Sequence, residues 1–170
     1  MGLLDFFSPL TPLAAAERLR DSATRLDLSE VEVRVAASLG VERHILLKER
    51  ILFRIAFSET SVDHAYRKDP DSNVREMGEH LERLNSNYVF SMPNVPAEVA
   101  GELCLRARAD YIMRQPNELA GKMLTSMYFG EFREVPADAL LSFSTLVHGY
   151  ARSTLVEAIE LAKKLTAWKR

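Results

Sequence analysis

The chain has 170 residues, of which 47% are hydrophobic and 27% charged, and its formal net charge is −2 at pH 7. This length suits one folded domain, 1–170, with a substantial core, and the composition excludes disorder over the whole chain. Proteins that bind nucleic acids usually carry an excess of basic residues, whose binding to phosphates releases counterions. Because this chain has no such excess, we do not expect a nucleic-acid partner.

The single cysteine and the absence of a long apolar run bear on the compartment. Cys104 cannot form an internal disulfide, and its setting among small and apolar residues is typical of a buried helix position. No window of about 18 uncharged apolar residues occurs, so no transmembrane helix is expected, and the first residues lack the basic start of a secretory signal. We therefore expect a cytoplasmic protein.

The apolar N-terminal tip, residues 1–11, is a candidate docking segment. Its large apolar side chains are Leu3, Leu4, Phe6 and Phe7. Such a segment usually docks on its own protein or on a subunit partner. Insertion into a membrane surface through residues 3–7 is the alternative.

Proline positions mark the starts of several predicted helices. Pro96, Pro116 and Pro136 are each followed two residues later by an acidic residue. Proline at a first helical position gives up only an amide that has no partner there, and the acidic residue faces the positive end of the helix dipole. With Thr11 as a further capping residue, we predict helices at 12–26, 30–39, 41–66, 73–90, 96–114, 116–129 and 136–168. The expected fold is all-α, a single bundle of about six to seven helices.

Residues 30–37 are the one ambiguous element. The sequence "EVEVRVAA" alternates valine with polar residues, which also suits a strand. We interpret it as a helix because Ser29 is a good N-terminal cap and no partner strand is evident.

The segment 43–57, "RHILLKERILFRIAF", is predicted to be the central helix of the bundle. Apolar residues occupy nearly its whole circumference, which is typical of a helix buried among other helices. Arg43, Arg50 and Arg54 fall close together on a helical projection. We expect this arginine ridge to be the only face of the helix that reaches water.

The last predicted helix carries an apolar seam along about thirty residues. At 1.5 Å per residue the seam would be roughly 45 Å long, longer than a small domain is wide. The helix therefore either wraps around the bundle or projects from it. A projecting end would expose Leu161, Leu165 and Trp168 as a partner interface.

Motifs typical of di-iron, calcium, phosphate-binding and serine-nucleophile sites are absent from the sequence. No histidine follows an acidic residue by three positions, as di-iron bundles require. Residues 69–80 begin like a calcium loop but have Val74 where glycine is needed and His80 where glutamate is needed. Phosphate-binding glycine loops and a serine nucleophile elbow are also missing. No metal, cofactor or catalytic residue is therefore assigned.

Two polar residues interrupt the apolar side of the central helix. His44 and Lys48 lie one turn apart and, together with Tyr111, could line an internal pocket in which Lys48 holds an anionic group. The alternative is that Lys48 lays its stem on the core and places its ammonium group in water.

The function predicted from these features is a non-enzymatic helical interaction protein: an adaptor, an assembly factor or a subunit of a larger complex. It rests on the missing motifs, the apolar tip and the long C-terminal seam, and it implies a protein partner or self-association. The alternatives are a small-molecule-binding protein or enzyme with a pocket near His44 and Lys48, and a peripheral membrane protein.

Overall fold

The computed structural model describes residues 10–91 and 135–167, which are helical apart from short connections. These two ranges contain five helices and no strand: α1 (Pro12–Ala23), α2 (Glu30–Leu39), α3 (Arg43–Lys68), α4 (Ser72–Ser91) and α8 (Ala137–Ala167). The all-α class is confirmed. The expected count of six to seven helices is not reached here, and the helices predicted at 96–114 and 116–129 lie outside the described residues.

Helix α2 resolves the ambiguity at residues 30–37 in favour of a helix. The Ser29 hydroxyl accepts a hydrogen bond from the Glu32 amide at 3.3 Å, and the Glu32 carboxylate accepts one from the Ser29 amide at 2.7 Å. This reciprocal capping box satisfies two amides that would otherwise lack partners. Gly40 ends the helix with a φ of 65°, a left-handed conformation that glycine adopts without strain.

Side-chain caps also fix the starts of α1 and α4. The Thr11 hydroxyl accepts a hydrogen bond from the Ala14 amide at 3.1 Å, with Pro12 at the first helical position. Before α4, the Asp71 carboxylate accepts one from the Asn73 amide at 2.7 Å. The Thr11 cap falls where the sequence predicts it.

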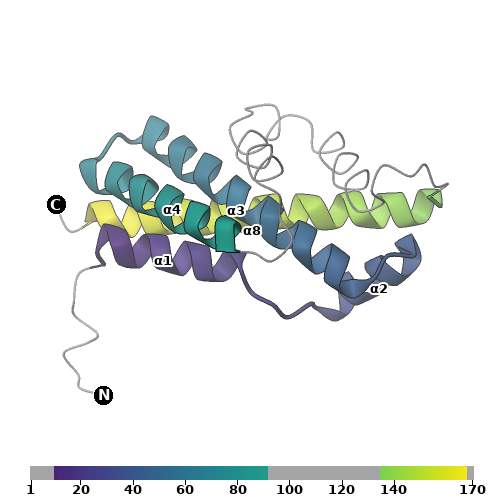
Figure 1. The fold of residues 1–170 in the computed structure, drawn as a ribbon. Helices are drawn as coiled ribbons and strands as arrows, with labels where there is room; N and C mark the ends of the chain where they lie inside the picture. The colour runs from purple at the N-terminus through teal and green to yellow at the C-terminus, as the bar shows by residue number, and fades with distance from the viewer. Residues whose placement is uncertain (1–9, 92–134, 168–170) are drawn as a thin grey trace, which may run out of the picture.

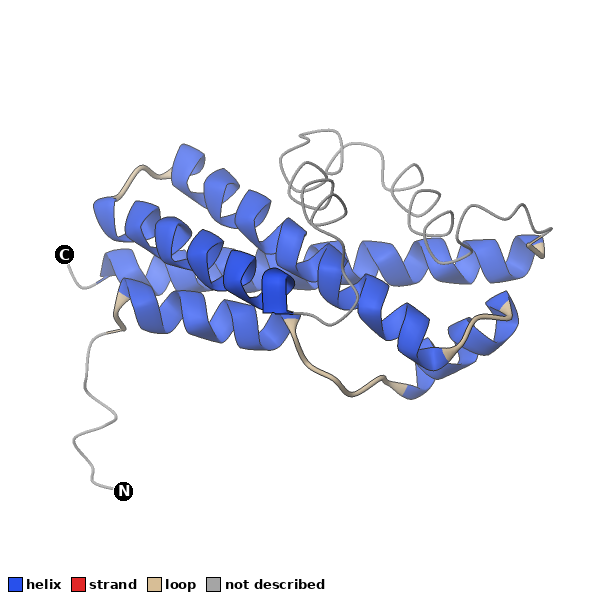
Figure 2. Ribbon diagram, viewed as in Figure 1, coloured by secondary structure: helices blue, strands red, loops and turns tan. Residues whose placement is uncertain are grey.

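The helices are arranged along α8, which runs the length of the bundle (Figure 1). Helices α1 and α4 pack side by side over one half of α8, and α2 packs against its other half. Helix α3 contacts all four of the others. The start of α1 and the end of α8 lie at the same end of the molecule, and short loops connect α1 through α4 (Figure 2).

The apolar interior falls into three clusters of buried side chains. One joins α2 to the first halves of α3 and α8, with Phe143 fully buried at its centre. A second joins α1 and α4 to the second halves of α3 and α8, around Met77 and Leu81. A third, smaller cluster lies between α1, α3 and α4. Because α3 contributes to all three, its prediction as the central helix is confirmed.

The predicted arginine ridge on α3 is wrong for two of its three members. Arg43 is exposed, but the side chains of Arg50 and Arg54 are only 6% and 14% exposed. Both guanidinium groups reach buried or half-buried oxygen atoms on other elements. The ridge is therefore a set of interior contacts and not the face that α3 presents to water.

Helix α8 follows the bundle and its described end does not project. Its thirty-one residues span about 46 Å at 1.5 Å per residue, and they contribute to both large clusters. Leu161 and Leu165 are 6% and 2% exposed and pack in the second cluster. The expectation that these leucines form a free partner interface is therefore wrong, because they already fill the core of their own chain.

Candidate functional site

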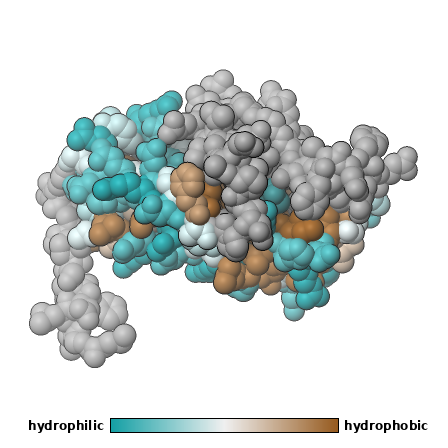
Figure 3. Space-filling view, in the orientation of Figure 1, coloured by the Kyte–Doolittle hydropathy of each residue, from teal (hydrophilic) through white to brown (hydrophobic). Residues whose placement is uncertain are grey.

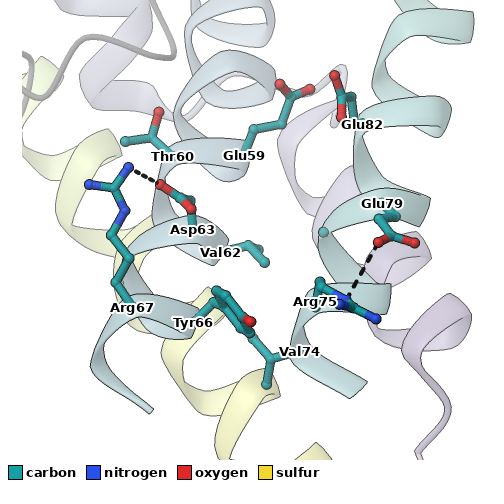
Figure 4. Close-up of a pocket in the computed structure, with 11 residues that line it drawn as sticks. Glu59, Thr60, Val62, Asp63, Tyr66, Arg67, Val74, Arg75, Glu79 and Glu82 are labelled. Atoms are coloured by element: carbon teal, nitrogen blue, oxygen red, sulfur yellow. Dashed lines mark ion pairs between the residues drawn. The ribbon is translucent and has the colours of Figure 1, made fainter. Parts of the chain in front are cut away.

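The candidate site is a groove between the second half of α3 and the first half of α4 (Figure 4). It has a volume of about 490 Å³, within the range of pockets that hold ligands. Its lining residues on each helix extend over about two turns, from Glu59 to Arg67 on α3 and from Val74 to Glu82 on α4. The groove is open to solvent along this length, so it suits recognition of an extended group at the surface.

The floor of the groove is apolar. Val62 and Val74 are buried there, and the ring of Tyr66 is half-buried beside them. Gly78 has no side chain, and a Cβ atom added to it would meet Val62 Cγ1 at 3.4 Å. Of these three apolar side chains, the Tyr66 ring is the one that solvent partly reaches, because Val62 and Val74 are 2% and 1% exposed.

The edges of the groove are predominantly acidic. Four carboxylates line it, those of Glu59, Asp63, Glu79 and Glu82, together with the guanidinium groups of Arg67 and Arg75. Two ion pairs join residues one turn apart on the same helix, Arg67 to Asp63 at 2.7 Å and Arg75 to Glu79 at 3.7 Å. The lining thus carries two more negative than positive charges.

Glu59 is held in position by a buried amide. Asn85 is 1% exposed, and its Nδ2 donates to Glu59 Oε1 at 2.9 Å and to the Ile55 carbonyl and Ser58 Oγ at 3.3 Å each. Fixing the carboxylate in this way lowers the entropic cost of using it to bind a partner. Figure 4 shows Glu59 of α3 and Glu82 of α4 at the same end of the groove.

A second group of charges is buried between α2, α3 and α8. Glu32 Oε1 accepts hydrogen bonds from Arg50 Nη1 at 3.1 Å and from the Tyr150 hydroxyl at 2.6 Å, and Ser29 donates twice to Oε2. Arg50 also donates to the main-chain carbonyls of Arg25 and Asp27 in the connection from α1 to α2. The network therefore ties three helices and one loop together.

The ionisation of this network follows from its contacts. Burial opposes the charge on Glu32, but the hydrogen bonds from Tyr150, Ser29 and Arg50 outweigh burial and lower its pKa. Burial raises the pKa of Tyr150, and its bond to the Glu32 carboxylate raises it further. Both groups are therefore fixed in their ordinary neutral-pH states, a carboxylate and a phenol, so the network suits structural support rather than proton transfer.

Arg54 forms a neighbouring set of contacts between α1, α3 and α8. Its guanidinium donates to Ser22 Oγ at 3.1 Å and to Thr154 Oγ1 at 3.3 Å, and it lies 3.8 Å from Glu157. Ser22 in turn donates to Glu157 at 2.7 Å. Burial lowers the pKa of Arg54 while Glu157 opposes that change. These contacts join three different helices. None of the four residues lines the α3–α4 groove.

His44 and Lys48 lie one turn apart on α3 but do not line the same hollow. His44 is 72% exposed in the first turn of α3, where its Nδ1 lies 3.1 Å from the Glu42 carboxylate. It borders an open hollow of about 490 Å³ between α2 and the start of α3, whose other lining residues are Val33, Ala36, Ala37, Val41, Glu42 and Arg43. Lys48 is half-buried and is not among the residues that line this hollow.

Several predicted site residues lie outside the described residues. They are Leu3, Leu4, Phe6, Phe7, Tyr111 and Trp168. Cys104 lies outside them as well. Docking through the N-terminal tip and a pocket closed by Tyr111 therefore stay predictions.

Neither the groove nor the Glu32–Arg50–Tyr150 network is predicted by the sequence patterns described above. The spacing of Ser29 and Glu32 matches a capping-box signature, which could have identified Glu32 as a helix-start residue. The bonds from Arg50 and Tyr150 have no such signal, because they join residues 18 and 118 positions away from Glu32. The groove likewise arises from how α3 and α4 pack.

Within 10–91 and 135–167, no three side chains of the histidine, cysteine or carboxylate types gather in a metal-binding arrangement. None of the helices in these ranges is both long enough and apolar enough to cross a bilayer. Comparison of the chain with models of known families, with curated proteins and with solved structures finds no match.

Proposed function

We propose that the protein is a non-enzymatic interaction protein, an adaptor, assembly factor or subunit, that binds a protein partner through the α3–α4 groove. The observation that carries this proposal is the form of the groove: an open surface channel with an apolar floor and charged edges. Interfaces between proteins combine the same two features, an apolar centre and a polar rim.

The distribution of the interior charges supports a binding role over a catalytic one. Glu32, Arg50 and Arg54 form hydrogen bonds that join different helices. Catalytic acids and bases are instead expected to face a concave site in which substrate can reach them. The charged residues that do face the groove are on its open edges.

Exposed apolar side chains add further surface for association. Leu26, Phe90 and Leu141 are each about 70% exposed. Figure 3 shows hydrophobic patches on the face that carries α1 and α4, while the end formed by the α3–α4 connection is mainly hydrophilic. Single exposed apolar residues are common in monomers, so the groove remains the principal support.

Site-specific crosslinking in the protein's own cell extract tests the proposal. A photo-crosslinking amino acid at Arg75, on the groove edge, should capture a defined protein partner, whereas the same group at Arg152, exposed on α8, should not. Capture of a second copy of the chain would identify self-association. Equal capture at both positions, or none at Arg75, would contradict the proposal.

A second candidate function is binding of a small anionic molecule in the hollow beside His44. It is favoured by the position of His44 and Arg43 on the edge of that hollow. Native mass spectrometry of the purified protein should then show a bound mass that His44→Gln abolishes. Retention of the same mass by the variant would exclude this hollow.

A further inference from the structure

Helix α2 is attached to the bundle by less apolar surface than the other described helices. It contributes three buried apolar side chains to the first cluster, Val35, Ala36 and Leu39, and among the described helices it packs chiefly on α3 and α8. In Figure 1 it lies at the opposite end of the bundle from the α3–α4 connection. Helices α1, α3, α4 and α8 are joined to one another by the larger second cluster, to which α2 contributes nothing.

The polar attachment of α2 converges on Arg50 of α3. The guanidinium group of Arg50 donates to Glu32 Oε1 at 3.1 Å and to the main-chain carbonyls of Arg25 and Asp27. These carbonyls belong to the connection from α1 to α2, so one side chain holds both the helix and the connection before it. Tyr150 of α8 adds a bond to the same Glu32 oxygen. Separation of α2 and separation of its connection therefore break the same group of bonds and are expected to occur together.

The residues on either side of α2 are suited to act as hinges. Arg25, Leu26 and Asp27 are all exposed in the connection from α1. At the other end, Gly40 has a φ of 65°, and a Cβ atom added to it would meet no atom within 4 Å. The backbone can therefore turn at both ends of α2 without moving a buried side chain of these four residues. We refer to residues 24–42 as the α2 strap.

We propose that the α2 strap opens as one unit while α1, α3, α4 and α8 stay packed together. Opening breaks the bonds of Glu32 and the contacts of three apolar side chains, whereas unfolding of the chain disrupts all three clusters. Parts of a protein held by fewer buried contacts open at a lower free energy than the whole. The open form is therefore more populated than the unfolded chain.

Opening has two consequences for the molecule. A helix of ten residues is shorter than the roughly 12–15 residues that an isolated helix needs in water, so α2 loses its helical hydrogen bonds once it leaves α3 and α8. The first cluster also loses the part of its covering that α2 provides. Its aromatic members Phe53 and Phe143 then become more accessible from that side.

Amide hydrogen exchange of the full-length chain tests the proposal, under conditions in which exchange rates report the equilibrium of opening. The amides of α2 should exchange about 100-fold faster than those of α4, relative to their rates in an unfolded peptide. Their exchange should also depend less on urea, because local opening exposes less surface than unfolding of the whole chain. This comparison uses the wild type alone.

A core variant distinguishes opening of the strap from unfolding of the bundle. Leu81→Ala in the second cluster weakens the closed and the open form alike relative to the unfolded chain. It should speed exchange in α4 by at least about tenfold and leave exchange in α2 unchanged within about twofold. Val74→Ala is a smaller truncation in the same cluster and serves if Leu81→Ala does not fold.

A variant of the strap tests its anchor. Glu32→Gln weakens the closed form alone, because the bonds of Glu32 to Arg50 and Tyr150 are absent once α2 has left. It should speed exchange in α2 about tenfold. Glu30→Gln, at an exposed position of the same helix, should leave that rate unchanged within about twofold.

Three results would overturn the inference. One is equal acceleration of exchange in α2 and α4 by the core variant, because α2 would then open only when the whole bundle unfolds. Another is the same exchange rate and the same urea dependence for the two helices in the wild type. The third is unchanged exchange of α2 in Glu32→Gln, which would show that the bonds of Glu32 do not hold the strap closed.

Discussion

Glu32 and Arg50 form an ion pair in the interior, with 3.1 Å between Oε1 and Nη1 and with both side chains 6% exposed. Glu32 is at the same time the third residue of α2 and part of its capping box. One carboxylate thus starts a helix and fastens it to α3 and, through Tyr150, to α8.

Replacing Arg50 with methionine should strongly destabilise the protein. The substitution leaves the Glu32 carboxylate buried without its cationic partner, and breaking a buried pair on one side costs about 3–5 kcal/mol. Urea unfolding followed by circular dichroism measures the change. Arg50→Met/Glu32→Gln should cost less than Arg50→Met, because it removes the unpaired charge. Asp21→Asn, which breaks the exposed pair with Arg20, should change the stability by only about 0–1 kcal/mol.

Glu32 should contribute to stability in a pH-dependent way. Its pKa in the folded protein is lowered from the ordinary value of 4.5, so its contribution is present above 4.5 and is lost as the pH falls through the lowered value. The stability difference between the wild type and Glu32→Gln should therefore shrink in urea unfolding series from about pH 7 to about pH 3. Glu30→Gln, exposed on the same helix, is the matched control. A constant difference for Glu32→Gln would contradict the lowered pKa.

Tyr150 should remain protonated at alkaline pH for as long as the protein stays folded. Its pKa is raised above the ordinary value of 10.0, so its contribution to stability is present below pH 10.0 and is lost as the pH rises towards the raised value. In a titration of tyrosinate absorbance, Tyr150 should contribute a step that occurs only on unfolding. That late step should be missing in Tyr150→Phe and present in Tyr88→Phe.

Two glycines should respond to alanine in opposite directions. Gly78→Ala should raise the unfolding free energy by about 0.5–1 kcal/mol, because alanine favours a helix and its Cβ would make an ordinary contact with Val62. Gly40→Ala should lower it by about 1–2 kcal/mol, because an L-residue is strained at a φ of 65°. Thermal and urea unfolding of the two variants, side by side, provides the comparison.

Leu52→Asp should unfold the bundle. Leu52 is 1% exposed on α3, and a large buried apolar side chain contributes roughly 1.5–3 kcal/mol even before the cost of burying a charge. Loss of the helical circular dichroism signal would show the effect. Leu26→Asp, at an exposed apolar position, should leave the signal intact.

The sequence was sufficient to predict those parts of the fold that depend on local signals. Caps at Thr11 and Ser29 and the apolar circumference of α3 identify helices whose ends agree with the structure to within a few residues. These signals act within one or two helical turns, so a single sequence contains them. The class of the fold follows from them directly.

Features that depend on packing between helices could not be predicted in this way. Arg50 and Arg54 look like a surface ridge on a helical projection, yet their partners on other elements place them inside. From the sequence, Leu161 and Leu165 could belong to a projecting, exposed seam. In the structure α8 packs along both clusters, and the second cluster buries the two leucines. The groove has the same origin, because its edges come from two helices and the absent side chain of Gly78 matters only where α4 meets Val62.

Helix α8 supplies buried side chains to both large clusters, Phe143 and Val147 to one and Ala158 and Leu165 to the other. Helix α8 therefore forms one side of both clusters. A break in the chain within this helix would open both at once, so a circularly permuted form of the protein should fold only if its new ends fall outside α8.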